Sequence, residues 1–181
     1  MADDIPPPEQ AAALDAWVLE NWSSAVAYAT SFLRDRASAE DVVHDCFYNL
    51  LRNAGRYDLP RDGTRLLFRS VTNECFKRNS RGKATVSLSL FEDDGAGIAD
   101  TSVPEPSLVA MTEELREAIA KALARLPLPQ QAALKLKSMG HSLHEIAQIL
   151  EVSVPNAGVL VHRARRALAD QLSDHVGGNA I

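Results

Sequence analysis

Apolar residues in the first half of the chain recur at steps of three and four residues, which places their side chains on one face of an α-helix. The pattern predicts a long amphipathic helix over residues 8–34. A second apolar stripe predicts a helix that begins at Ser38, three residues before Asp41 as in a capping box, and stops near Gly55. A third helix is expected to start around residues 62–64. Three helices joined by short turns predict a compact bundle.

The helical spacing stops after this bundle and resumes near Val109. The segment between contains glycine, proline, serine and acidic residues, a composition typical of a flexible linker. We therefore predict an all-α protein in which a three- to four-helix bundle and a four-helix domain are joined by an acidic linker. The predicted divisions are a tail at 1–8, a domain at 9–81, the linker at 82–108, a domain at 109–176 and a tail at 177–181.

The second domain contains a pattern typical of a helix-turn-helix. Pro127 and Pro129 are expected to end its first helix, and a second helix follows them. Ser142 and Glu145 then form a capping-box pattern at the start of a short helix. A three-residue turn at 151–153 leads to a longer helix with basic residues on its outer face. Such a helix can enter the major groove of DNA, although an ordinary helical hairpin has the same pattern.

Charge is distributed unevenly along the chain. The net charge is -5, so the protein as a whole does not attract nucleic acid. From Arg61 to Lys83, however, seven basic residues stand against two acidic ones. From Glu92 to Glu105 there are five acidic residues and no basic one. This asymmetry predicts one basic patch, suited to phosphate, on an otherwise acidic protein.

No sequence pattern indicates catalysis, a metal site or a cofactor. The segment from His144 to Gln148 resembles the HExxH zinc pattern but has glutamine in place of the second ligand. His141 and His144 have no cysteine or carboxylate cluster beside them, so solvated surface histidines are the expected state. There is no Gly-rich phosphate loop and no GxSxG sequence. We expect a protein without enzymatic activity.

The compartment is predicted from the cysteines and the N-terminus. Cys46 and Cys75 lie in apolar stripes without a CxxC partner, as expected of buried free thiols in a reducing compartment. The N-terminal residues are acidic and rich in proline, unlike a signal peptide. No apolar run approaches the roughly 20 residues that a membrane span needs. These features predict a cytoplasmic protein that does not insert into a membrane.

Several segments together resemble a known family. Residues 122–127, 142–147 and 162–168 (Ala-Leu-Ala-Arg-Leu-Pro, Ser-Leu-His-Glu-Ile-Ala and His-Arg-Ala-Arg-Arg-Ala-Leu) are similar to domain four of bacterial RNA polymerase sigma factors. The most similar type is the extracytoplasmic-function class, group 4 of the sigma-70 family. Residues 39–51 resemble the helix by which that class binds core polymerase, and residues 67–73 resemble its promoter-melting segment.

The resemblance implies a transcription initiation factor. Its partners would be core RNA polymerase (the clamp helices of the largest subunit and the beta flap), promoter DNA and an anti-sigma factor. It assigns core polymerase binding to Asp41, Val42, His44, Asp45, Phe47, Asn49 and Leu50. It assigns the minus-ten element and the melted strand to Arg65, Arg69, Asn73, Lys77, Arg78, Arg81 and Lys83. It assigns the minus-thirty-five element, through the helix-turn-helix at 144–163, to Ser153, Pro155, Asn156, Val159, His162, Arg163 and Arg166.

Two departures from the family pattern affect the helix-turn-helix. Glu151 occupies a turn position where glycine is common, and a left-handed backbone there would cost roughly 1 kcal/mol. Gly158, Val159 and Leu160 stand where the family commonly has a basic-polar-basic triplet. We expect Val159 and Leu160 to be exposed, facing thymine methyl groups or a protein partner. The alternative function is a sigma-like interaction module that binds an anti-sigma factor or core polymerase without contacting bases.

Overall fold

The computed structural model describes residues 8–80 and 113–176, and the regular structure within these ranges is helical throughout. The chain divides into two compact units, one within residues 1–87 and the other within residues 88–181. The predicted all-α architecture is therefore confirmed. Among the described helices, none combines the length and the apolar character that a membrane crossing requires.

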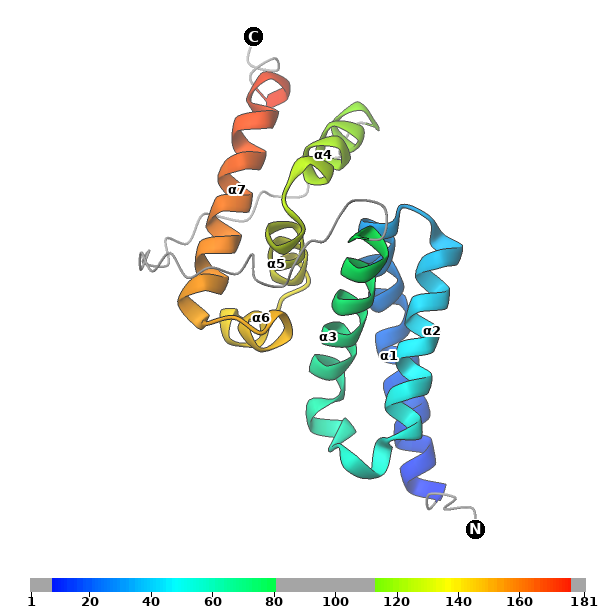
Figure 1. Ribbon diagram of the computed structural model, residues 1–181. Helices are drawn as coiled ribbons and strands as arrows, with labels where there is room; N and C mark the ends of the chain where they lie inside the picture. The colour runs from blue at the N-terminus through cyan, green and yellow to red at the C-terminus, as the bar shows by residue number, and fades with distance from the viewer. Residues whose placement is uncertain (1–7, 81–112, 177–181) are drawn as a thin grey trace. The chain divides into compact units, whose positions relative to one another are not determined.

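The first unit is a bundle of three long helices. Each packs against the other two, and they run side by side in Figure 1. The elements in order are α1 (Pro8–Leu33), α2 (Arg36–Arg52), the short 3₁₀ helix η1 (Ala54–Arg56) and α3 (Leu59–Ser80). The predicted first helix agrees with α1 to within one residue, whereas α2 and α3 begin earlier than expected.

Aspartates cap both of the helices that begin early. The carboxylate of Asp35 accepts a hydrogen bond from the N–H of Ser38 at 2.9 Å, so Asp35 and not Ser38 is the N-cap of α2. Hydrogen bonds from Ser38 hold the pKa of Asp35 below its usual value. Asp58 accepts from the N–H of Arg61 at 3.3 Å in the same way at the start of α3. Pro60 is tolerated in that first turn because its missing N–H would have no intrahelical partner there.

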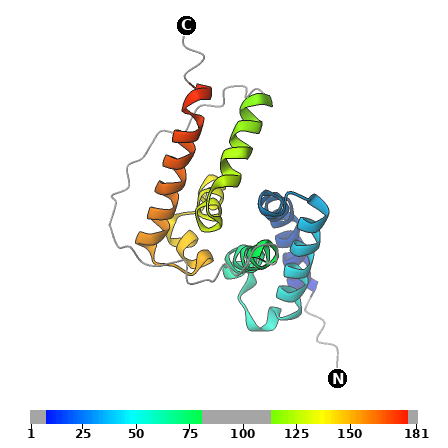
Figure 2. The same cartoon turned by 45° about the horizontal axis from the view of Figure 1, so that its top comes forward.

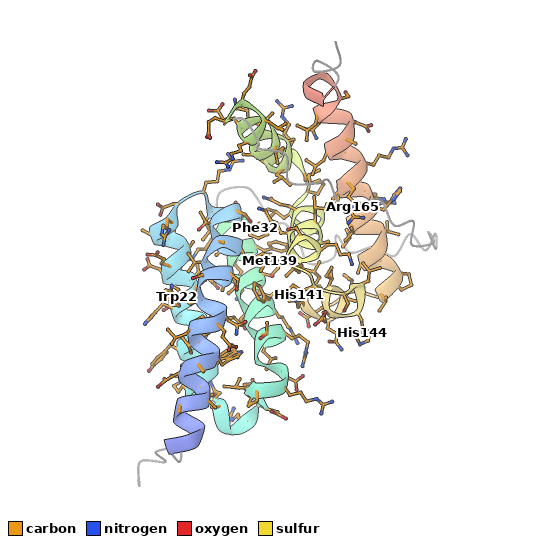
Figure 3. The ribbon with its side chains drawn as sticks, turned by 180° about the vertical axis from the view of Figure 1, so that it is seen from behind. Trp22, Phe32, Met139, His141, His144 and Arg165 are labelled. Atoms are coloured by element: carbon orange, nitrogen blue, oxygen red, sulfur yellow. The ribbon has the colours of Figure 1, made fainter. Side chains whose placement is uncertain are left out.

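An aromatic cluster connects α1 with α2 near one end of the bundle. The ring of Phe47 meets the ring of Trp17 edge to face at 5.2 Å between centroids. It also stacks on Trp22 at 5.8 Å, and Figure 3 labels Trp22 on α1. Offset and edge-to-face arrangements of this kind are the favourable ones for aromatic pairs. Phe47 therefore belongs to the core of the first unit.

A buried hydrogen bond connects α1 with α3 near the middle of the bundle. The hydroxyl of Tyr28 lies 2.8 Å from Oγ1 of Thr72, and the hydroxyl of Thr72 donates to the backbone oxygen of Phe68 at 2.6 Å. Since a threonine hydroxyl has one proton, Tyr28 must be the donor to Thr72. Burial raises the pKa of Tyr28, so it keeps that proton. Both hydroxyls are thus satisfied inside an apolar core.

Gly63 of α3 lies directly against the Trp17 ring of α1. A Cβ atom at Gly63 would lie 2.9 Å from carbon atoms of the Trp17 ring. The ring cannot easily move away, because its N–H donates to Oγ1 of Thr64 at 3.3 Å and its edge meets Phe47. Thr64 in turn donates to the side chain of Asn21 at 3.1 Å. Glycine at position 63 thus sets the distance between the two helices.

Between residues 113 and 176 the structure describes four helices of the second unit, with α7 packed against the other three. They are α4 (Glu113–Arg125), α5 (Leu128–Ser138), α6 (Leu143–Leu150) and α7 (Val154–Val176). Figure 2 shows α4 and α7 side by side. Pro129 does not end α4 as expected; it lies in the first turn of α5 and is buried. A proline is tolerated at that position for the same reason as Pro60.

Substitution of Gly63 by alanine should destabilise the first unit. Alanine normally favours a helix over glycine by about 1 kcal/mol, but here its methyl group would overlap the Trp17 ring. We expect a net loss of about 1–3 kcal/mol in the free energy of unfolding in urea. The control is Gly55→Ala, where a Cβ would meet nothing within 4 Å. Equal stabilities of the two variants would contradict the proposed close approach.

Candidate nucleic-acid and protein interfaces

The outer face of α2 carries four of the residues that the sequence assigned to a protein partner. Asp41, His44, Asp45 and Asn49 are exposed. The other three face inward and are buried, so their assignment to the interface is corrected: Val42, Phe47 and Leu50. The reason is the bundle itself, since the inward stripe of α2 fills the space against α1 and α3.

An aromatic residue that the sequence analysis missed lies on this outer face. Tyr48 is 57% exposed, and the guanidinium of Arg52 lies 5.7 Å from the centre of its ring. It follows Asp41, His44 and Asp45 by seven, four and three residues, so the four side chains share one face of α2. Exposed aromatics are frequent anchors of protein interfaces. The apolar stripe predicted for this helix includes Phe47 and leaves out Tyr48, so helical spacing alone indicated that Phe47 could belong to the core and that Tyr48 lies outside it.

The candidate basic face lies on α3. The side chain of Lys77 is exposed, and four others are partly exposed: Arg65, Arg69, Asn73 and Arg78. Arg81 and Lys83 lie outside the described residues. Within α3, five basic residues stand against two acidic ones, so the helix keeps an excess of positive charge. Such an excess on one helix is suited to contact with phosphates.

Carboxylates of α3 neutralise part of this charge. Glu74 lies 3.7 Å from Nζ of Lys77 and 3.6 Å from Nε of Arg78. Asp62 pairs with Arg65 at 3.2 Å. Arg78 also donates to the backbone oxygen of Ser38 at 3.4 Å and so helps to hold α3 against α2. The cations of this face therefore differ in how freely they can turn toward a phosphate.

The helix-turn-helix forms as predicted at α6 and α7. The Ser142 hydroxyl accepts from the N–H of Glu145 at 3.2 Å, and the Glu145 carboxylate accepts from the N–H of Ser142 at 2.8 Å. This reciprocal pair is a complete capping box. In the turn, Glu151 has a left-handed backbone with φ 58° and ψ 42°. Ala147 is buried in the middle of α6 and leaves room for α7 to cross.

The start of α7 presents small and apolar groups. The Ser153 hydroxyl accepts from the N–H of Asn156 at 3.3 Å and caps the helix. Ser153 and Pro155 are exposed, and Asn156 is partly exposed. Further along α7, four basic side chains are exposed: His162, Arg163, Arg165 and Arg166. Figure 3 labels Arg165 on α7.

The expectation of an exposed Val159 is wrong. Its side chain is 7% exposed, and Leu160 is only partly exposed. Helical spacing places Val159 on the same face as His162, Arg163 and Arg166, three, four and seven residues further on. Such spacing gives the direction of a side chain, not what packs over it. Val159 is therefore removed from the candidate base contacts.

The histidines and cysteines of the described residues form neither a metal site nor a reactive thiol. Within the described residues, no group of three histidine, cysteine, aspartate or glutamate side chains could hold a metal ion. The ring Nε2 of His144 is 3.1 Å from the Gln148 amide nitrogen, the residue that interrupts the zinc pattern. Cys46 and Cys75 are free and buried. Burial raises the pKa of both thiols to about 12, which keeps them protonated and unreactive at neutral pH.

Each of the two units of the chain matches a known family model. A model of the family "Sigma-70 region 2" matches residues 17–83, and a model of "Sigma-70, region 4" matches residues 116–168. Among curated proteins, the ECF RNA polymerase sigma factor SigW of Bacillus subtilis is 29% identical over 147 residues, covering 75% of this chain and 76% of SigW. The ECF sigma factor SigM of Mycobacterium tuberculosis is 29% identical over 137 residues, covering 75% of this chain and 65% of SigM.

A solved structure has the same fold. The sigma factor RpoE, crystallised in complex with the anti-sigma factor NepR from Bartonella quintana, superposes with a TM-score of 0.65 at 22% sequence identity. The match covers 88% of this chain and 96% of the RpoE chain.

Replacement of Glu151 by glycine should stabilise the second unit. Glycine adopts the left-handed turn without the steric cost that glutamate bears, although it gains freedom in the unfolded chain. We expect a net gain of about 0.5–1 kcal/mol in thermal or urea unfolding. Glu151→Ala removes the same side chain but keeps the steric cost, so it should give no gain. A gain of the same size for alanine would show that the side chain, not the backbone, is responsible.

Neutralising Glu74 should strengthen binding to nonspecific duplex DNA. Glu74→Gln removes the charge paired with Lys77 and Arg78 and adds one net positive charge to the face. We expect a roughly two- to fivefold gain in affinity at low salt that disappears at high salt. Glu20→Gln makes the same charge change at an exposed position of α1 and serves as the control. Equal gains for both variants would mean that only net charge matters.

Proposed function

This chain belongs to the extracytoplasmic-function sigma factors of the sigma-70 family and directs transcription initiation with RNA polymerase, and from that premise we propose which of its surfaces contact polymerase and promoter. The observation that carries the proposal is the separation of exposed groups by sign. The outer face of α2 carries carboxylates and an exposed aromatic ring, whereas α3 has an excess of basic residues and the later turns of α7 carry exposed cations.

The outer face of α2 is the proposed contact with core polymerase, at the clamp helices of its largest subunit. Asp41 and Asp45 supply two carboxylates for a basic partner surface, and His44 and Asn49 add hydrogen-bonding groups. Tyr48 supplies the aromatic anchor that Phe47, being buried, cannot. In the second unit we propose a further contact with the beta flap. These two attachments would hold both units on one enzyme.

The basic face of α3 is the proposed site for the minus-ten element and the melted strand. Arg65, Arg69 and Lys77 have side chains that reach solvent, and Asn73 can donate to a base or to a phosphate. Arg81 and Lys83 continue this run in the sequence. Phosphate contacts supply most of the affinity for an opened strand, and the retained positive excess of α3 supports the assignment.

The helix-turn-helix is the proposed site for the minus-thirty-five element. Ser153, Pro155 and Asn156 stand at the end of α7 that enters a major groove in this motif. The exposed side chains of His162, Arg163 and Arg166 would contact phosphates beside that groove. Val159 has no part in the proposal.

We further propose that an anti-sigma factor masks the protein when core polymerase is absent. The support is the fold shared with RpoE, which was crystallised with the anti-sigma factor NepR. A cytoplasmic location is proposed because initiation takes place where the polymerase and the chromosome are. The domain limits 9–81 and 109–176 also stand as proposals, supported by the matched ranges 17–83 and 116–168.

Run-off transcription tests the proposed assignment directly. Purified core polymerase is mixed with genomic promoter fragments, with and without this protein. We expect specific transcripts that require the protein and that fall at least tenfold with Arg69→Ala and Lys77→Ala combined, because two phosphate contacts are lost. Binding to core polymerase without any transcript, on a pool that covers the genome, would favour the interaction module instead. No binding to core polymerase would contradict the proposal.

Tyr48→Ala should weaken binding to core polymerase by about ten- to thirtyfold, the loss typical of an aromatic anchor. The free energy of unfolding should stay nearly constant, since the side chain is exposed. Tyr57→Ala is a matched control, because Tyr57 is a tyrosine of the same unit that is 45% exposed but lies outside α2. Competition binding with labelled protein measures both affinities. An unchanged affinity of the Tyr48 variant would exclude this residue from the interface.

A further inference from the structure

The recognition helix α7 changes character along its length. From Ser153 to Val161 there is no charged residue, whereas three arginines and a histidine occur between His162 and Arg166. The family's usual cations are absent from positions 158–160, which hold glycine, valine and leucine. A helix that anchors on phosphates through its first two turns would have cations there. This one can do so only from its third turn onward.

The backbone at the start of α7 is also a poor partner for phosphate. A helix N-terminus usually binds anions through its first free N–H groups. Here Pro155 has no N–H group, and the N–H of Asn156 is bonded to the Ser153 hydroxyl. Two of the first three positions therefore offer no donor to a phosphate. The end of the helix that meets the groove has neither charge nor many free donors.

The same end exposes apolar groups. Val154 is 40% exposed, although valine is ordinarily a buried residue, and Pro155 beside it is also exposed. The proline fixes the local backbone, so these two side chains present a rigid surface. Ala157 and Val161, three and seven residues after Val154, are buried and hold α7 against the other helices of its unit. In the major groove, the apolar feature that distinguishes one base from another is the C5 methyl group of thymine.

The spacing along α7 matches the dimensions of the groove. At 1.5 Å per residue, Arg163 lies about 14 Å and Arg166 about 18 Å along the axis from Val154. The major groove is about 8.5 Å deep, so when the tip of the helix meets the bases these cations lie outside the groove, and their long side chains must extend back toward its phosphate edges. Residues 11 apart share a helix face, which pairs Pro155 with Arg166 and Val154 with Arg165.

We propose that Val154 and Pro155 recognise thymine methyl groups in the minus-thirty-five element, while the cations from His162 to Arg166 contact phosphates. This inference rests on the proposed function of the helix-turn-helix. Specificity at the minus-thirty-five element then depends on van der Waals contact with methyl groups. Affinity depends on a separate set of charges, those from His162 to Arg166, about two turns further along α7.

Substitution of deoxyuridine for thymine tests the proposal, because it removes one methyl group and nothing else. The probe is a duplex that contains the minus-thirty-five element of the strongest promoter found by run-off transcription. Its binding to the holoenzyme of core polymerase and this protein is measured. Each thymine of the element is replaced in turn on each strand. At one or two positions we expect affinity to fall about fourfold, the factor for burying one carbon group. No deoxyuridine effect at any position would overturn the proposal.

Variants identify the side chain that makes the contact. With Val154→Ala or Pro155→Ala, affinity for thymine and deoxyuridine probes should become equal at those positions, whereas Val154→Ile should keep the difference. Arg166→Ala should weaken both probes alike and lower the salt dependence by about one phosphate contact. If Val154→Ala weakens every probe equally and leaves the thymine preference intact, the apolar end contacts a protein, and the proposal is overturned.

Different variants test the thymine contacts and the DNA-binding function of α7. The proposed function of α7 is supported if the holoenzyme initiates at specific promoters and if Arg163→Ala and Arg166→Ala lower its affinity for the promoter. This holds whether or not deoxyuridine changes that affinity. If neither substitution changes the affinity for the promoter, the proposed function of the helix-turn-helix itself is contradicted.

Discussion

The close contact of Trp17 with Gly63 and Phe47 determines the arrangement of the whole first unit. A glycine lets α1 and α3 approach to the distance of one indole ring, and Phe47 then fills the space on the α2 side between Trp17 and Trp22. Once these three helices are locked at that spacing, each has one face left for solvent. The candidate polymerase face on α2 and the candidate DNA face on α3 are those remaining faces.

The second unit depends on a comparable constraint in its turn. The capping box at Ser142 fixes where α6 begins, and the left-handed Glu151 fixes where it ends and how α7 departs. The chain bears the cost of a non-glycine residue at that turn, so the crossing of the two helices must be held by packing around Ala147 and Ala157, both buried. A defined crossing is what a DNA-binding helix requires, because an error of a few ångströms would move its tip out of the groove.

The two proposed DNA surfaces use different physical means. On α3, positive charge is abundant but partly neutralised by Glu74 and Asp62. The phosphates of a nucleic acid would compete with these carboxylates for the same cations. On α7, charge is absent from the first two turns and concentrated later. A run of cations suits an opened strand, because phosphate contacts follow its backbone whatever the base sequence. Apolar contact with few charges suits the choice of one duplex sequence over another.

The sequence by itself determined the helices, the two-domain order and the helix-turn-helix, because these follow from local periodicity, capping residues and turn residues that act within a few positions of one another. The predicted starts of α2, α3 and α5 were displaced where Asp35, Asp58 and Pro129 provided caps or a first turn that the pattern did not isolate. Motif resemblance added the family, since two motifs in the right order are specific even without a structure.

Only the tertiary structure decided which members of those helices face outward. Phe47 and Tyr48 are adjacent aromatics, yet one is locked between two tryptophans and the other is exposed beside Arg52. Val159 lies on the polar face of α7 by spacing and is nevertheless buried. The ion pairs of Glu74 with Lys77 and Arg78 differ from these cases, because they join residues three and four positions apart on one helix, a spacing that the sequence already contains. Burial depends on groups distant in the chain, which no local pattern of residues contains.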